Sequence, residues 1–338
     1  MKSKESLKDI QPQNISALLE SHYFNIMSAF YETQSSYLTG IYKRFGGIES
    51  ANIAICFARN LHLEIIRQRE KNLNYNVSLE SFWKNFENVE RPIEKVSKIV
   101  QITGIPKETA RRKIKNLLSI GFIKDNTKTK GYYLDLLPKH KDSYSVMISD
   151  EIKILSKFTL GFAKYLGLNL NSKLIEQEIK SQFSFYWYHF LSCQIQWLKI
   201  WQTKLKDNDL LLIILQTIIP TLQYAEKHDF RVPVANKYKI IGKIKDEKNF
   251  FKAAISAATV AEVTGIPRST CTRKLNKLVT LGFLLRETKT KRYFVNQNIL
   301  DRTKNVLTES NVTSTIDIFS KYLSIILNSM IHNKNNFA

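Results

Sequence analysis

One segment of the 338-residue chain occurs twice, 161 residues apart. Shifting the sequence by this distance places 96–134 on 257–295 without a gap, and 15 of the 39 aligned positions hold the same residue. Such a repeat indicates one supersecondary unit made twice in the same chain. We therefore expect an N-terminal tail at 1–14, a first repeat at 15–173 and a second repeat at 174–338.

Each copy has the pattern of two helices followed by a hairpin. In the first copy, helices are expected over 92–100 and 106–120, with a turn at Thr103-Gly104. Apolar residues recur at i, i+4, i+7 and i+8 in the second helix, so one face of it is expected to be buried; they are Ala110, Ile114, Leu117 and Leu118. Short strands at 122–124 and 132–134 flank a polar tip. The second copy repeats these elements at 255–263, 267–281, 283–285 and 293–295.

Long helices are expected on both sides of each motif. Helical patterns cover 15–45 and 174–205 before the two motifs, and 149–166 and 312–331 after them. The apolar run at 210–219 is shorter than the roughly 20 residues of a membrane-spanning helix, so we interpret it as a buried helix. The predicted fold class is therefore mainly α, with two tandem units and long flanking helices.

Helix, tight turn, helix and basic hairpin together resemble the winged helix-turn-helix DNA-binding regulators. The motifs that carry the resemblance are Thr-Gly-Ile-Pro-Lys-Glu-Thr-Ala-Arg-Arg-Lys at 103–113 and Thr-Gly-Ile-Pro-Arg-Ser-Thr-Cys-Thr-Arg-Lys at 264–274. With the flanking helices, the order of elements is similar to that of the MarR-type regulators, whose terminal helices from two protomers intertwine in a dimer. The resemblance implies two winged units related by a pseudo-twofold axis, with both protomers joined in one chain.

The net charge favours a polyanionic partner. The chain carries 51 Lys and Arg against 30 Asp and Glu, a formal charge of +21. Eight basic and two acidic residues fall within 105–131, and eight basic and one acidic within 266–292, so these two segments hold +13 of that excess. Because the charge gathers on the two motifs, we expect them to meet double-stranded DNA rather than a membrane surface.

The face of each second helix opposite its apolar stripe is expected to contact bases in the major groove. Arg112 and Arg273 occupy matching positions there, and a guanidinium can pair bidentately with guanine. Lys113 and Lys274 on the helix flank suit phosphate contacts, and the two hairpin tips suit the DNA backbone or the minor groove. The residues predicted to bind DNA are Lys107, Glu108, Thr109, Arg111, Arg112, Lys113, Lys115, Lys128, Thr129 and Lys130 in the first copy, and Arg268, Ser269, Thr270, Thr272, Arg273, Lys274, Asn276, Lys277, Lys289, Thr290, Lys291 and Arg292 in the second.

The predicted function is that of a sequence-specific, double-stranded DNA-binding transcriptional regulator. It would act as a monomeric pseudo-dimer in the cytoplasm, at the nucleoid. The base-reading positions differ between the copies, so we expect two unlike half-sites with centres about 10 bp, or a multiple of this, apart. Three alternatives stay open: a plasmid or phage replication initiator with tandem winged helices, a non-specific nucleoid-associated protein, and a protein-interaction module built from winged helices. Further self-association and a small-molecule effector stay open too.

Other chemistry has little support in the sequence. Cys56, Cys193 and Cys271 and the six histidines have no metal-ligand spacing, and we find no phosphate-binding glycine loop, nucleophile elbow or paired carboxylates. We therefore expect no enzymatic activity, no cofactor, no metal and no membrane partner. Cys271 aligns with Ala110, which predicts a small buried residue. The aromatic-rich stretch at 183–201 is interpreted as a buried helix, with a ligand pocket as the alternative.

Overall fold

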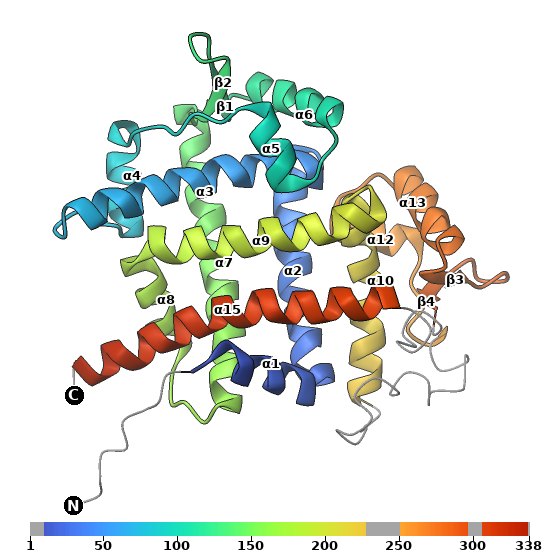
Figure 1. Cartoon of the computed structure of the whole chain (residues 1–338). Helices are drawn as coiled ribbons and strands as arrows, with labels where there is room; N and C mark the ends of the chain where they lie inside the picture. Colours follow the sequence, from blue (N-terminus) through green and yellow to red (C-terminus); the bar gives the residue numbers. More distant parts are fainter. Residues whose placement is uncertain (1–9, 228–250, 297–305, 337–338) are drawn as a thin grey trace, which may run out of the picture.

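The computed structural model describes residues 10–227, 251–296 and 306–336, and this part of the chain is mainly helical (Figure 1). The elements of the first half are α1 (Pro12–Ser21), α2 (Tyr23–Phe45), α3 (Ile48–Lys71), α4 (Leu79–Asn85), the 3-10 turn η1 (Phe86–Asn88), α5 (Val96–Thr103), α6 (Lys107–Ser119), β1 (Ile123–Asn126), β2 (Gly131–Leu134) and α7 (Pro138–Tyr165). Those of the second half are α8 (Ser172–Ser181), α9 (Phe183–Leu205), α10 (Asp209–Lys227), α12 (Ala257–Thr264), α13 (Arg268–Thr280), β3 (Leu284–Arg286), β4 (Tyr293–Val295) and α15 (Val306–Asn336). None of the helices described is both long and apolar enough to span a bilayer.

Six long helices form two crossed layers. In Figure 1, α3, α9 and α15 run across the view, and α2, α7 and α10 run roughly at right angles to them. Within the first layer α9 packs between α3 and α15, and within the second α2 packs between α10 and α7. Each layer therefore combines helices from both halves of the sequence. When the sequence is shifted by 161 residues, α3 aligns with α10 and α2 aligns with α9.

The short helices and the ends of the chain also pack across the two halves. Helix α1 lies against α15, and α8 lies against α7. The backbone N–H of Ile10 donates to Asn328 Oδ1 at 2.7 Å, and the hydroxyls of Ser16 and Ser320 lie 3.0 Å apart. Residues 10–14 are thus held on the second half, whereas 1–9 of the predicted tail lie outside the described residues. The predicted repeat boundaries at 14/15 and 173/174 fall inside α1 and α8.

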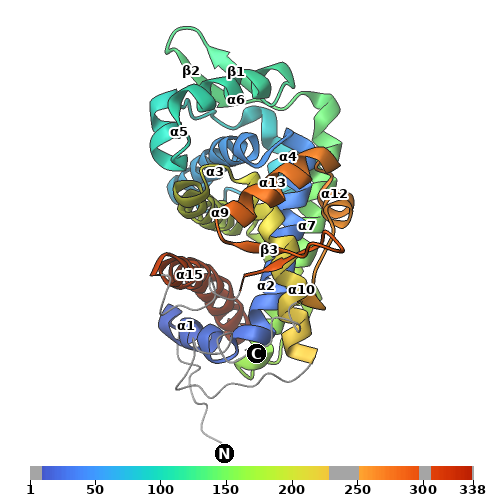
Figure 2. The ribbon, with the colours of Figure 1, turned by 90° about the vertical axis from the view of Figure 1, so that its right-hand side faces the viewer.

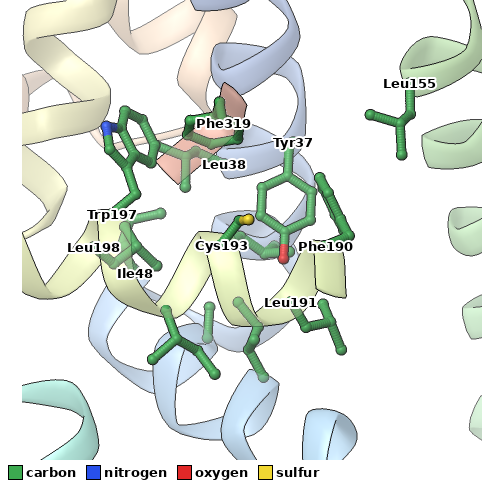
Figure 3. Packing of buried hydrophobic residues seen from close by; sticks show 14 of the residues in the cluster. Tyr37, Leu38, Ile48, Leu155, Phe190, Leu191, Cys193, Trp197, Leu198 and Phe319 are labelled. Carbon is green, nitrogen blue, oxygen red and sulfur yellow. The ribbon is translucent and has the colours of Figure 1, made fainter. Parts of the chain in front are cut away.

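One hydrophobic cluster runs through both halves. Figure 3 shows Tyr37 of α2 against Phe190 of α9, and Trp197 of α9 near Phe319 of α15. The ring centroids of the first pair lie 5.2 Å apart in an edge-to-face arrangement, which aromatic pairs prefer. Most of the aromatic stretch at 183–201 is buried in this cluster, and the apolar run at 210–219 is likewise part of a mostly buried helix, α10, as predicted.

A short extended segment replaces the expected helix start at residue 92. Glu94 and Tyr132 exchange two backbone hydrogen bonds with N···O distances of 2.7 and 2.9 Å, so Glu94 lies beside β2 as a one-residue bridge. Ile255 and Tyr293 make the same exchange in the second half, at 2.9 and 2.8 Å. Helices α5 and α12 begin only after these bridges. The helix starts predicted at 92 and 255 were wrong because both segments pair with their hairpins in extended form.

The two long helices predicted before the motifs are each broken. The break in the first falls at His22, with φ −113° and ψ 33°, and the break in the second at Gln182, with φ −114° and ψ 39°. Each break changes the direction of the chain, so that α1 reaches α15 while α2 packs against α10. Long-range packing thus divides a segment that has a continuous helical pattern. The helices after the motifs are longer than predicted, over 138–165 and 306–336.

Candidate nucleic-acid interface

The turn before each of the exposed helices α6 and α13 is closed by a threonine. Thr103 Oγ1 donates to Ile99 O at 2.8 Å and accepts from the N–H of Ile105 at 3.2 Å. Thr264 makes the same two bonds in the second half, at 2.7 and 3.2 Å. The glycine that follows has φ 71° in one turn and 74° in the other, a left-handed conformation that glycine adopts without a side-chain clash. The Thr-Gly-Ile-Pro sequence therefore sets the same local geometry twice.

Helices α6 and α13 each span 13 residues and bury one face. Ala110, Ile114 and Leu117 are at most 1% exposed, as are Cys271, Leu275 and Leu278 at the matching positions of α13. The predicted apolar stripe is confirmed, with Leu118 half-buried at its edge, and Cys271 is a buried core residue as expected. Because this face is buried, the opposite face of each helix is left toward solvent.

Most of the residues predicted to bind DNA are exposed, either on the outer faces of α6 and α13 or at the hairpin tips. Thr109, Lys113, Thr270 and Thr272 are half-buried, and Lys274 is buried. The exposed ones are Lys107, Glu108, Arg111, Arg112, Lys115, Lys128, Thr129, Lys130, Arg268, Ser269, Arg273, Asn276, Lys277, Lys289, Thr290, Lys291 and Arg292. We call this exposed set the basic surface.

Arg112 and Arg273 are the two arginines at matching positions on the basic surface. Both are exposed, and neither has a hydrogen-bond or ion-pair partner among the described residues. Their neighbours differ: Arg111 pairs with Glu108 at 2.7 Å, whereas Asn276 Oδ1 accepts from the Tyr293 hydroxyl at 2.9 Å. The two shared guanidinium groups can therefore meet a ligand without first breaking a contact with those residues.

Both hairpin tips are held by the side chain at the same repeat position. In the first, Asn126 Oδ1 accepts from the N–H of Thr129 at 3.0 Å. In the second, the carboxylate of Glu287 accepts from the N–H groups of Thr290 and Lys289, and these bonds hold its pKa below the usual value. Lys130 and Lys291 then adopt φ 51° and 55°. The tips therefore present their lysines on similarly shaped backbones.

Lys274 does not belong to the basic surface, contrary to the sequence-based prediction. Its side chain is 7% exposed, and its Nζ lies 2.6 Å from Asp207 Oδ2 and 3.2 Å from Asp209 Oδ2. A buried ammonium between two carboxylates is not available to a phosphate, so we leave Lys274 out of the proposed interface. The sequence around Lys274 gives no sign of this pairing, because Asp207 and Asp209 are 67 and 65 residues away along the chain.

The matching Lys113 approaches the same junction from the other helix. Its Nζ lies 3.9 Å from Glu49 Oε2 and close to Gly47, where the chain passes from α2 to α3. The N–H of Ile48 at that junction donates to Asp209 Oδ1 at 3.0 Å. Lys113 and Lys274 therefore tie α6 and α13 to one cluster of acidic side chains between them, which we call the junction cluster: Glu49, Asp207 and Asp209.

The two exposed helices lie at neighbouring edges of the crossed layers. In Figure 1, α6 and its hairpin are at the top and α13 and its hairpin at the right, and both hairpin tips point away from the helical body. Figure 2, which looks onto the right-hand side, shows α13 facing the viewer below α6. Because both helices also reach the junction cluster, the arrangement can present two basic helices to one extended ligand.

The described residues contain no group of three or more His, Cys, Asp or Glu side chains placed to hold a metal ion. In comparisons with known proteins, no family model, no curated protein and no solved structure matches this chain.

Proposed function

We propose that this protein binds double-stranded DNA sequence-specifically and regulates transcription, as a single-chain pseudo-dimer acting at the nucleoid. The observation that carries the proposal is the pair of basic helices, α6 and α13, each of which buries one face and exposes an unpaired arginine at the same position. An α-helix fits the major groove of B-DNA, and arginine is the side chain that most often reads guanine there.

We infer that the chain is an internal duplication of a winged helix-turn-helix unit. Four observations support this: equal lengths and matching bounds of α5 and α12 and of α6 and α13, the repeated threonine turn, the repeated extended bridge and the repeated hairpin tip. Under the 161-residue shift α3 corresponds to α10 and α2 corresponds to α9. The packing of α3 on α9 therefore has its counterpart in the packing of α10 on α2, which supports a pseudo-twofold relation. Joining both halves in one chain gives each an effective concentration of about 1 mM for the other.

In this mechanism α6 and α13 each bind one half-site, and each hairpin tip contacts phosphates. Arg112 and Arg273 would read one base pair each, whereas Lys128, Lys130, Lys289 and Lys291 would contact the backbone and supply affinity without reading sequence. The residues beside the arginines differ between the halves, with Arg111 and Lys115 in one and Thr272 and Asn276 in the other. The preferred site should therefore contain two unlike half-sites.

Selection of bound sequences from random duplex DNA tests the function. The full chain should enrich a non-palindromic site with two half-sites, bound at least about 10³-fold more tightly than random duplex at the same salt concentration. The double variant Arg112→Ala with Arg273→Ala is the control, and it should lose the enrichment while its helical circular dichroism is unchanged. Equal affinity for every duplex would indicate a non-specific DNA-binding protein, and absence of duplex binding at low salt would refute the proposal.

A further inference from the structure

A cavity lies beneath the first hairpin, and most of its wall comes from the first half of the chain. Its volume is about 70 Å³, and its wall includes residues from α2, α3, α4, α7, α9 and the first hairpin, among them Tyr37 and Leu191, which Figure 3 shows. A cavity needs only about 10–15 Å³ to hold one water, whereas an apolar cavity of about 150 Å³ holds a benzene ring. The space therefore suits a molecule of about four non-hydrogen atoms.

The wall is apolar except for a few groups, and Glu151 of α7 is the acidic one. Its Oε1 is shielded from solvent and accepts no hydrogen bond from the residues that the structure describes. Burial raises the pKa of Glu151 to about 8. A buried carboxyl oxygen without a donor is costly, and a ligand that brings an N–H group would remove this cost.

Among the other polar groups on the wall, the indole Nε1 of Trp83 is buried and has no hydrogen-bond partner among the described residues, whereas His62 is engaged and uncharged. His62 Nδ1 lies 3.2 Å from Ser184 Oγ, and burial lowers the pKa of His62 to about 3, so the ring is neutral. Arg44, whose charge acts on Glu151, donates to Ser143 Oγ at 2.7 Å and lies over the ring of Tyr144 at 4.3 Å. Because the NH groups of Arg44 are bound to Ser143 and not to Glu151, the ionised Glu151 is left as the counter-ion for a cation inside the cavity.

The second half does not repeat the features that make this cavity. At the positions 161 residues later, Leu215 stands for Ala54, Ile219 for Ala58 and Val312 for Glu151. Leu215 is 1% exposed, so the matching fold tolerates a large buried side chain at that place. The small side chains and the acid are therefore a property of the first half, and the shared framework does not require them.

We propose that this cavity is a binding site for a small primary aliphatic amine of about two to four carbon atoms. The ammonium group donates to Glu151 Oε1, and the alkyl chain lies against Ala54, Ala58 and the ring of Trp83. The ammonium pairs with the ionised form of Glu151. A carboxylate of the same size would place a second negative charge beside that form, and an alcohol would lack the charge of the ammonium. The site is independent of DNA binding, so each can fail while the other holds.

The experiment is a titration of the full chain with n-propylamine at about pH 9, where Glu151, with a pKa of about 8, is mostly ionised, followed by the ¹⁵N-indole resonances of its tryptophans. Trp83 and Trp187 line the cavity and Trp201 does not, which makes Trp201 an internal reference. We expect saturable shifts of the Trp83 and Trp187 signals, with a Kd on the order of 1 mM or tighter. Propionate and 1-propanol, which match n-propylamine in size, should bind at least about tenfold more weakly.

Two variants separate the charge from the space. Glu151→Gln keeps the shape and should raise the Kd for n-propylamine at least about tenfold. Ala54→Leu copies Leu215, fills the cavity and should abolish the shifts while Glu151 is still present. Equal binding of n-propylamine and 1-propanol, an unchanged Kd in Glu151→Gln, or no shift of Trp83 and Trp187 up to about 50-fold above the expected Kd would each overturn the proposal.

Discussion

Lys113 and Lys274 occupy the same position of the repeat and have different surroundings. Lys274 Nζ lies between two carboxylates at 2.6 and 3.2 Å, whereas Lys113 Nζ lies 3.9 Å from Glu49 and its side chain is 21% exposed. Arg112 and Arg273, one residue before, are exposed in both halves. The two halves therefore keep a common outer surface but support it with different contacts underneath.

The largest difference between the halves should appear in stability. Lys274→Ala leaves Asp207 and Asp209 without their cation, so the free energy of unfolding should fall by about 3–4 kcal/mol. Lys113→Ala removes one longer, partly solvated contact and should cost at most about 1 kcal/mol. Urea denaturation of the two variants measures both. Equal losses would show that the two lysines are equivalent after all.

A second difference concerns pH, because the position matching Glu151 holds Val312. Burial raises the pKa of Glu151 to about 8, so between its unfolded and folded pKa values the folded state binds the extra proton, and stability falls as pH rises. Burial lowers the pKa of His62 to about 3, so the titration of this residue changes the stability only below pH ~6.5. Between about pH 6.5 and about pH 8.5 the free energy of unfolding of the wild type should fall by about 2 kcal/mol because of Glu151, and Glu151→Gln should not show this fall. A parallel pH profile of the two proteins in urea titrations would contradict this.

The arginines should behave alike if the outer surface is shared. Arg112→Ala and Arg273→Ala should each weaken binding to the selected DNA site by about 1–2 kcal/mol and relax specificity at one base pair, in opposite half-sites. Fluorescence anisotropy with single-base variants of the site measures this. Lys157→Ala, an exposed lysine on α7, is the matched control and should leave affinity unchanged. Loss of specificity in the same half-site for both variants would break the assignment of one helix to each.

The smallest effect is expected at the hairpin tips. Lys128→Ala and Lys289→Ala should each weaken binding to every duplex alike, by less than about 1 kcal/mol. Each should also reduce by about one the slope of the logarithm of affinity against the logarithm of salt concentration. Affinity measured at several salt concentrations gives this slope. A change in sequence preference without a change in slope would instead place the tip lysines on bases.

Local features of the motifs were predictable from the sequence because neighbouring residues decide them. The threonine turn, the buried stripe with Ala110 and Cys271, and the paired strands follow from glycine conformation and side-chain periodicity. The extended bridge at Glu94 and the break at His22 were not predictable in this way, since each depends on a contact with a distant segment. The cavity at Glu151 was not predictable for the same reason, because its wall combines residues that are far apart in the sequence, from α2 to α9.

By itself, the sequence determined that two copies of one basic helix-and-hairpin motif occur 161 residues apart, with the same buried stripe in each. Only the tertiary structure decided which basic residues stay outside. Lys274 is buried because it binds Asp207 and Asp209, 67 and 65 residues away, at the junction of α9 and α10. The physical reason is that periodicity fixes which face of a helix is apolar, whereas burial of a charge depends on counter-ions that only the packed chain brings together.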